Sequence, residues 1–401
     1  MTNRNSLKST LFLLLIAFIS SKVLASTGIE ENDFKISGFS TLGIVNAGNS
    51  TLGYRRDVSR EAVFDDTTFK SDSLLALQLD IKPQSSLSSA IQLVARDRSD
   101  NSIEDSLEWA YAKCRLNRNW VARTGRLGLD IFMLSEYRNL GFSYLWARPP
   151  VELYAPMGIE HFDGVDLSYS KILDEGEIRL KAFSSLKDEQ LFGVSLSFET
   201  AKARFRLGAT SIDFGGEGSK VIALLKPALQ SAGVLGWADA SRYARELDIE
   251  GKHIRRYSAG VSYDHNRWRF QSELAYIESD YKPFSPLWNG YFNIGYRVDP
   301  VTFFILFGYA KNVGDIENAS AAPPGFEALQ GSLQSLLNRV RADQKTASFG
   351  LKWDVRYDTS VKLQADHTWV EQYGGVLWQQ KQDLVNDTEL DTISLNINFV
   401  F

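Results

Sequence analysis

The chain has 401 residues, of which 44% are apolar, 12% aromatic and 23% charged, so it can fill a large core or cover a membrane-facing surface and is not disordered. Acidic residues outnumber basic ones by 49 to 44, and the net charge of -5 argues against a nucleic-acid partner. The single cysteine, Cys114, excludes an intrachain disulfide and a zinc site of four thiolates, and nothing in the sequence requires a metal or an organic cofactor.

Residues 1–25 have the pattern of a secretory signal peptide. Arg4 and Lys8 precede the apolar run 11–19. Val23 and Ala25 place compact side chains three residues and one residue before the expected cleavage site, which follows Ala25. A membrane anchor is the alternative, but this short run covers only about half of a hydrocarbon core of roughly 30 Å. We expect residues 1–25 to be removed and residues 26–401 to form one exported domain.

Segments of roughly ten residues with apolar side chains at every second position follow one another along the rest of the chain. The segment 391–401 (DTISLNINFVF) shows the pattern most clearly. The alternation predicts sixteen strands, near 34–45, 72–82, 87–96, 106–115, 119–127, 162–171, 177–184, 191–199, 203–213, 254–264, 267–279, 287–298, 300–311, 346–356, 360–371 and 391–401. In 300–311, Phe304 and Leu306 make the second face apolar as well, so either a loop covers this strand from inside or the expected register is wrong there.

The connectors between these strands alternate between tight turns, such as 173–176 and 264–266, and longer polar segments. A soluble β-sandwich or propeller explains the alternation within a strand but gives no reason to sort connectors by length. A barrel that crosses an outer membrane explains this sorting of connectors, because it must close on itself in hydrocarbon and has short turns on one side. The sequence therefore predicts an all-β fold, a transmembrane up-and-down antiparallel β-barrel of sixteen strands, wide enough for an aqueous channel.

Aromatic residues near the strand ends support a membrane-facing wall. They lie on the apolar face, where rings favour the headgroup levels, and include Tyr169, Phe198, Tyr257, Tyr263, Trp268, Tyr276, Tyr296, Tyr309, Tyr357 and Trp369. Two long connectors have helical spacing instead, at 221–247 and 326–340. We expect short amphipathic helices there, over the extracellular mouth.

With these features the chain resembles the Gram-negative outer-membrane porins, which are sixteen-stranded diffusion channels and usually homotrimers. The resemblance covers most of 34–401 and rests on the opening strand FKISGFSTLGIV (34–45), the segment WVARTGR (120–126), the long connector after it and the closing strand. Phe401, with Phe399 and Ile397 before it, resembles the signal that the barrel-assembly machinery reads. The connector carries no acidic motif that matches the general porins, so substrate preference does not follow from the resemblance.

The resemblance implies that the connector 128–161 is the third long loop, which folds into the lumen and narrows it. Its apolar side chains suit packing against a barrel wall, and its charged ones would face water. A loop packed over the rim or on a neighbouring subunit is the alternative. The candidate pore-lining residues, from this loop and from the inner wall, are Arg126, Asp130, Glu136, Arg138, Arg148, Arg179, Lys181, Arg204 and Arg206, and Glu152 would also face water.

The expected register turns twelve basic and seven acidic strand residues inward, which favours a mild preference for anions. The basic residues are Arg96, Arg126, Arg179, Lys181, Arg204, Arg206, Arg256, Arg269, Arg297, Lys352, Arg356 and Lys362; the acidic ones are Asp80, Glu108, Asp166, Glu199, Glu273, Asp354 and Asp366. The densest basic patch combines residues 179, 181, 204 and 206, and internal ion pairing with Glu199 and acidic loop residues is the alternative use of these charges.

The sequence thus predicts an outer-membrane porin, a water-filled channel for passive diffusion of ions and small hydrophilic solutes in a Gram-negative bacterium. Expected partners are outer-membrane lipid and lipopolysaccharide, the barrel-assembly machinery and, by resemblance, further copies in a homotrimer. A substrate-specific channel and a non-conducting structural barrel stay open as alternatives. A barrel enzyme is disfavoured, because none of the histidines 161, 253, 265 and 367 stands beside a Ser or Asp motif typical of catalysis.

Overall fold

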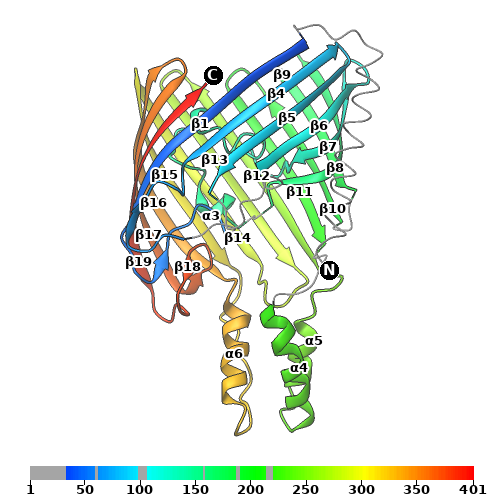
Figure 1. The fold of residues 1–401 in the computed structure, drawn as a ribbon, viewed down its shortest axis with the longest axis vertical. Helices are drawn as coiled ribbons and strands as arrows, with labels where there is room; N and C mark the ends of the chain where they lie inside the picture. Colours follow the sequence, from blue (N-terminus) through cyan, green and yellow to red (C-terminus); the bar gives the residue numbers. More distant parts are fainter. Residues whose placement is uncertain (1–32, 59–61, 98–105, 157–158, 187–189, 214–219) are drawn as a thin grey trace.

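The computed structural model describes residues 33–58, 62–97, 106–156, 159–186, 190–213 and 220–401, so the expected signal peptide lies outside the described residues. Sixteen antiparallel strands form the wall of one closed barrel (Figure 1). These strands are β1 (Phe34–Ala47), β4 (Leu74–Gln84), β5 (Leu87–Arg96), β6 (Leu107–Arg115), β7 (Trp120–Gly128), β8 (His161–Leu173), β9 (Gly176–Ser185), β10 (Leu191–Glu199), β11 (Ala203–Asp213), β12 (His253–His265), β13 (Trp268–Ser279), β14 (Leu287–Val298), β15 (Val301–Asn312), β16 (Ala342–Arg356), β17 (Thr359–Gly375) and β19 (Thr388–Val400). The predicted fold class is confirmed.

Each wall strand pairs with the next one along the chain, and β1 closes the ring against β19. Closure extends to the last residue, since the backbones of Gly38 and Phe401 exchange two hydrogen bonds of 2.8 and 2.9 Å. A Cβ atom on Gly38 would lie 2.4 Å from the ring of Phe401. The glycine therefore leaves space for the terminal ring at the seam of the barrel.

Burial along the strands is inverted relative to a soluble protein. In β19, Ser394 and Asn396 are fully buried, whereas the alternating Ile393 and Leu395 are 56% and 42% exposed. The wall thus presents polar residues to its interior and apolar residues to its surroundings, as a barrel in lipid requires. Separately, no helix in the described part of the chain is long and apolar enough to cross a membrane.

Aromatic rings pair on the outer face at both ends of the wall. Trp268 and Tyr296 lie 4.7 Å apart, centroid to centroid, near the tight turns, and Tyr276 and Trp288 lie 4.8 Å apart near the long loops. Their position at the strand ends agrees with the sequence expectation and fits the two aromatic belts of a membrane barrel.

The tight turns and the long loops lie at opposite rims, and the C-terminus lies at the turn rim (Figure 1).

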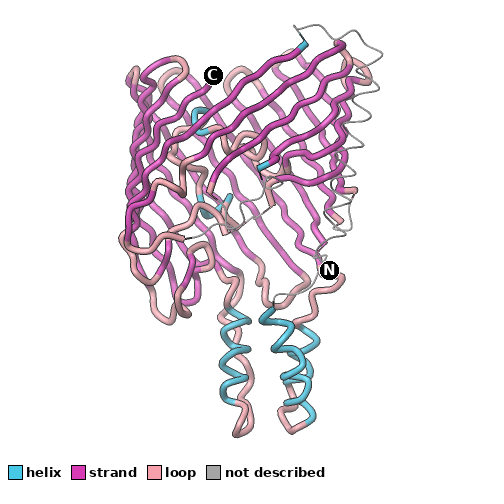
Figure 2. Tube along the Cα trace, viewed as in Figure 1, coloured by secondary structure: helices cyan, strands magenta, loops and turns pink. Residues whose placement is uncertain are grey.

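The predicted helices form within two long loops, as α4 (Lys220–Val234) and α5 (Ala240–Glu246) in one and α6 (Glu327–Asn338) in the other. They project away from the loop rim instead of lying over the mouth, which corrects the expected placement (Figure 2). The reason is a core of their own, in which Leu229 of α4 and Leu333 of α6 are fully buried.

Candidate channel constriction

The described residues of the connector between β7 and β8, 129–156 and 159–160, lie inside the barrel and contain the short helices η2 (Gly141–Ser143) and α3 (Val151–Tyr154). We call this connector the inner loop. Its apolar side chains form the main interior core with the wall: Trp146 is 1% exposed, and Phe304 and Leu306 of β15 are 1% and 4% exposed in the same cluster. The inner loop therefore explains why β15 is apolar on both faces, and the expected register of that strand holds.

Two lysines of the inner wall hold one side of the inner loop. Lys362 of β17 donates hydrogen bonds to the carbonyl oxygens of Gly141, at 2.5 Å, and Trp146, at 2.6 Å. Lys352 of β16 donates to the carbonyl oxygen of Phe142 at 2.9 Å. Both lysines face inward as expected, and both bind loop backbone.

Arg148 joins the inner loop to a second loop and to the wall. Its guanidinium lies 3.5 Å from Asp72 and 3.4 Å from Asp366, and it donates to the hydroxyls of Ser394, at 2.6 Å, and Tyr54, at 2.6 Å. The side chain is buried, so the expectation that it faces water is wrong. Two carboxylates compensate its charge in this buried position.

Glu152 of α3 is also buried, against the expectation that it faces water. Its carboxylate accepts hydrogen bonds from the Thr346 hydroxyl and, at 2.8 Å, from the Gln344 amide, and its backbone carbonyl accepts one from Asn289 at 2.9 Å. Burial raises the pKa of Glu152, and among the described residues no basic side chain contacts its carboxylate to stabilise the charge.

On the other side of the lumen, acidic residues of the inner loop meet the basic wall. Asp130, which is buried rather than water-facing, lies 2.8 Å from Lys181 and 2.9 Å from Arg206. Glu136 lies 2.7 Å from Arg123 and 3.1 Å from Lys181. Burial opposes ionisation of Glu136, but these two cations hold its pKa well below its usual range.

The remaining members of the basic patch are paired within the wall. Arg179 lies 2.8 Å from Glu177, and Arg204 lies 2.8 Å from Glu199. The structure thus brings the expected patch together and also pairs each of its charges with a carboxylate, which is the alternative considered from the sequence. Its net field in the lumen is correspondingly small.

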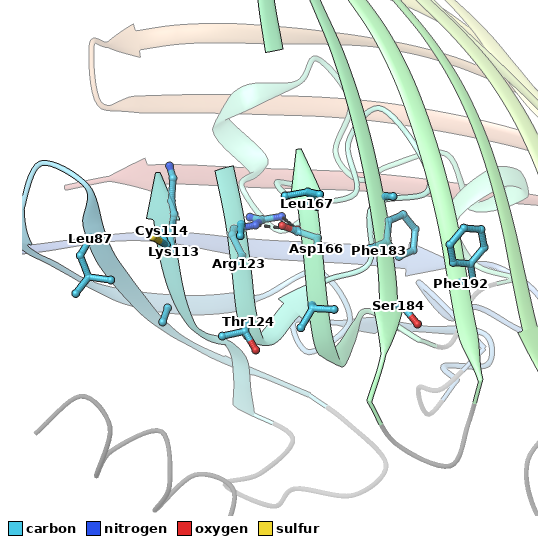
Figure 3. A pocket seen from close by; sticks show the side chains of 14 residues that line it. Leu87, Lys113, Cys114, Arg123, Thr124, Asp166, Leu167, Phe183, Ser184 and Phe192 are labelled. Carbon is cyan, nitrogen blue, oxygen red and sulfur yellow. Dashed lines mark hydrogen bonds and ion pairs between the residues drawn. The ribbon is translucent and has the colours of Figure 1, made fainter. Parts of the chain in front are cut away.

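Arg126 lies on the opposite face from the one expected. It pairs with Asp163 at 3.0 Å, which shares the outer face of β8 with the exposed Val165. The inward arginine of β7 is Arg123, whose Nε atom lies 2.8 Å from the Asp166 carboxylate (Figure 3). The sequence did not predict that Arg123 faces inward. The inner loop makes the inward face of β7 partly apolar, so the alternation of apolar residues does not show which face points to the lumen.

A second group of ion pairs joins the inner loop to β5. Arg138 lies 2.9 Å from Glu160, which also pairs with Arg96. Arg96 lies 3.5 Å from Glu108 as well and donates to the side chain of Asn139 at 2.8 Å. Arg138 is mostly buried here, within an ion-pair network rather than in open water.

One cavity lies on the inner face of the wall and another lies on its outer face. The inner one, of about 300 Å³, separates residues 135–140 of the inner loop from β1, β4, β5 and β6, and its polar lining includes Gln78, Gln92 and Glu136. The outer one, of about 460 Å³, is a groove over β6–β10 where small outward residues such as Ala122 leave room (Figure 3). No three metal-binding side chains come together among the described residues.

No protein-family model and no curated protein matches the sequence. Solved structures do match. OmpF of Salmonella typhi, in complex with daunomycin, superposes with a TM-score of 0.54 and 10% identity over 93% of this chain and all of that one. The barrel has the porin fold. OmpT of Vibrio cholerae gives 0.53 at 8% identity, covering 93% and 99%, and an anion-selective porin from Comamonas acidovorans gives 0.53 at 10%, covering 92% and 99%.

Proposed function

We propose that the chain is a passive diffusion channel of a Gram-negative outer membrane, with a narrow passage between the inner loop and the wall of β1 and β4–β6. The observation that carries this proposal is the inner cavity, which separates residues 135–140 from that wall while the opposite side of the loop is bound tightly to β16 and β17. The porin fold and the apolar outer wall support the same function.

The lining of the cavity favours small, polar solutes. Gln92 donates to Gln78 at 2.7 Å and Gln78 donates to Asp80 at 3.0 Å, so a chain of amides lines the wall opposite Glu136. Amides bind water and hydroxyl groups without attracting one sign of ion. Since the basic patch is also paired, we propose a weak ion preference, with any bias toward anions smaller than the number of inward basic residues suggests.

Conductance tests the passage. The mature chain, in a planar bilayer under a salt gradient, should give discrete steps with a reversal potential close to zero or slightly toward the anion. Gln92→Trp should reduce the step size because it fills the cavity, and Ile91→Trp, on the exposed outer face of the same strand, should not. Silence from a folded, heat-modifiable barrel would favour a plugged or non-conducting barrel, and equal steps from both variants would place the passage elsewhere.

We further propose a homotrimer, with lipid, lipopolysaccharide and the barrel-assembly machinery as partners and with no enzymatic activity. The fold supports the trimer, since one matched structure is OmpT of Vibrio cholerae in a trimer form. The last strand supports assembly, because Phe399 and Ile397 face outward and Phe401 completes the seam. Unheated gel electrophoresis and light scattering of the folded chain should give three times the mass of one barrel.

A further inference from the structure

Arg256 is the exception among the arginines that are buried within the described residues. Arg148 pairs with Asp72 at 3.5 Å, and Arg341 donates to the carbonyl oxygen of Asp315 at 2.9 Å. Less buried arginines of the wall also pair with carboxylates, among them Arg206 with Asp130 and Arg269 with Asp264. Within the described residues Arg256 has neither an ion pair nor a hydrogen bond, and its Nη1 atom is buried without a partner.

The side chain lies between the wall and the inner loop. Arg256 is 6% exposed, and its guanidinium carbon lies 5.0 Å from the centre of the Phe132 ring. Across the sheet it stands opposite Thr210 of β11 and Ile277 of β13, which are 7% and 0% exposed. The guanidinium is therefore flanked by one aromatic ring, one aliphatic side chain and one hydroxyl.

The neighbouring carboxylates are engaged elsewhere. Glu273 accepts hydrogen bonds from the hydroxyls of Tyr154, at 2.6 Å, and Tyr291, at 2.8 Å, and from the backbone amide of Met133 at 2.7 Å. Asp130 is bound to Lys181 and Arg206. Both of these carboxylates are thus already paired or hydrogen-bonded.

A guanidinium stays charged in a protein, and a buried charge without a counter-charge is more unfavourable than one ring can offset. Lys362 shows how the same barrel satisfies a fully buried cation, since two carbonyl oxygens accept its hydrogen bonds. No such acceptor for Arg256 lies among the described residues, so a negative group from solution would compensate its charge. Phe132 and Ile277 flank the guanidinium and favour a small group over a bulky one.

We propose that Arg256 binds a small inorganic anion such as chloride between Phe132 and the wall of β11–β13, with the Thr210 hydroxyl as a second donor. This site lies beside Phe132, near the start of the inner loop. It is separate from the cavity beside residues 135–140. An anion bound there compensates the guanidinium and adds a contact that keeps the inner loop against the wall.

Bromide, as a chloride substitute with an anomalous X-ray signal, tests the site in crystals of the folded mature chain. We expect an anomalous peak in contact with the Arg256 guanidinium in the wild-type chain and in Arg269→Gln, because the latter removes a paired arginine elsewhere. Arg256→Gln should lose the peak. A water molecule in place of bromide over Arg256, or a peak that persists in Arg256→Gln, would overturn the proposal.

A solution measurement covers the case in which Arg256→Gln does not fold. The thermal midpoint of the wild-type barrel should be a few degrees higher in chloride than in gluconate at equal ionic strength, since gluconate is too large for the site. Arg256→Lys, which keeps the charge, should keep part of this difference, and Arg269→Gln should keep all of it. Equal thermal midpoints of the wild-type barrel in chloride and gluconate would contradict the anion site. This result does not depend on whether the barrel conducts ions.

Discussion

Glu152 is the residue whose ionisation should control how firmly the inner loop is docked. Burial raises its pKa, so the docked loop favours the protonated carboxyl. In an undocked loop the group titrates near its ordinary value of about 4.3. Docking is therefore strongest below that value and weakens by about 1.4 kcal/mol per pH unit until the pH passes the raised pKa.

Hydrogen exchange of residues 141–154 measures this effect. We expect the wild-type loop to exchange faster at pH 8 than at pH 4 after correction for intrinsic rates. Glu152→Gln should remove that dependence, because an amide oxygen still accepts from Gln344 and Thr346 but carries no charge. Glu327→Gln, on the exposed end of α6, is the matched control and should behave as wild type. An unchanged pH dependence in Glu152→Gln would assign it to another group.

At the scale of elements, Lys362 supplies two of the hydrogen bonds that hold the inner loop against the wall. Lys362→Met leaves the carbonyls of Gly141 and Trp146 buried without a donor, which costs about 1–3 kcal/mol for each group. We expect residues 141–146 to detach and the single-channel conductance to rise. Lys345→Met, on the outer face of the neighbouring strand, should leave both unchanged. Conductance equal to wild type in Lys362→Met would show that this side of the loop does not limit flow.

The strands were predictable because lipid outside and water inside impose the same period of two on every one of them. β19 agrees with that rule from Thr392 to Phe399, and its neighbours were placed correctly from it. The interior was not predictable at the same level. Leu127 on β7 is inward and buried by the inner loop, so apolar character no longer marks the lipid face there, and Arg126 was placed on the wrong side. The charge of Arg148 was evident, but its burial depends on Asp72 and Asp366, which only the closed barrel brings together.

At the scale of the whole molecule, the helices α4, α5 and α6 form a unit outside the barrel, which we call the helical projection. Its core joins the two loops, since the Trp237 indole donates to Ser320 at 3.2 Å and the backbone amide of Ser320 donates to the Tyr243 hydroxyl at 2.9 Å. Trp237 and Leu229, on one loop, are almost fully buried against Leu333 and Leu337 on the other. Neither loop covers its own apolar face, so each needs the other.

Deleting the projection in parts tests this dependence. Replacing 220–249 alone by a short turn should expose the apolar face of α6, and the folded barrel should then bind a hydrophobic dye and aggregate. Replacing 315–340 alone should do the same to α4 and α5, while replacing both should restore a dye-free, heat-modifiable barrel, because the wall strands keep all their pairing. The effect of the double deletion would then be far from the sum of the single ones, as coupled elements require. Dye binding by the double deletion as strong as by either single one would show instead that the wall itself depends on the projection.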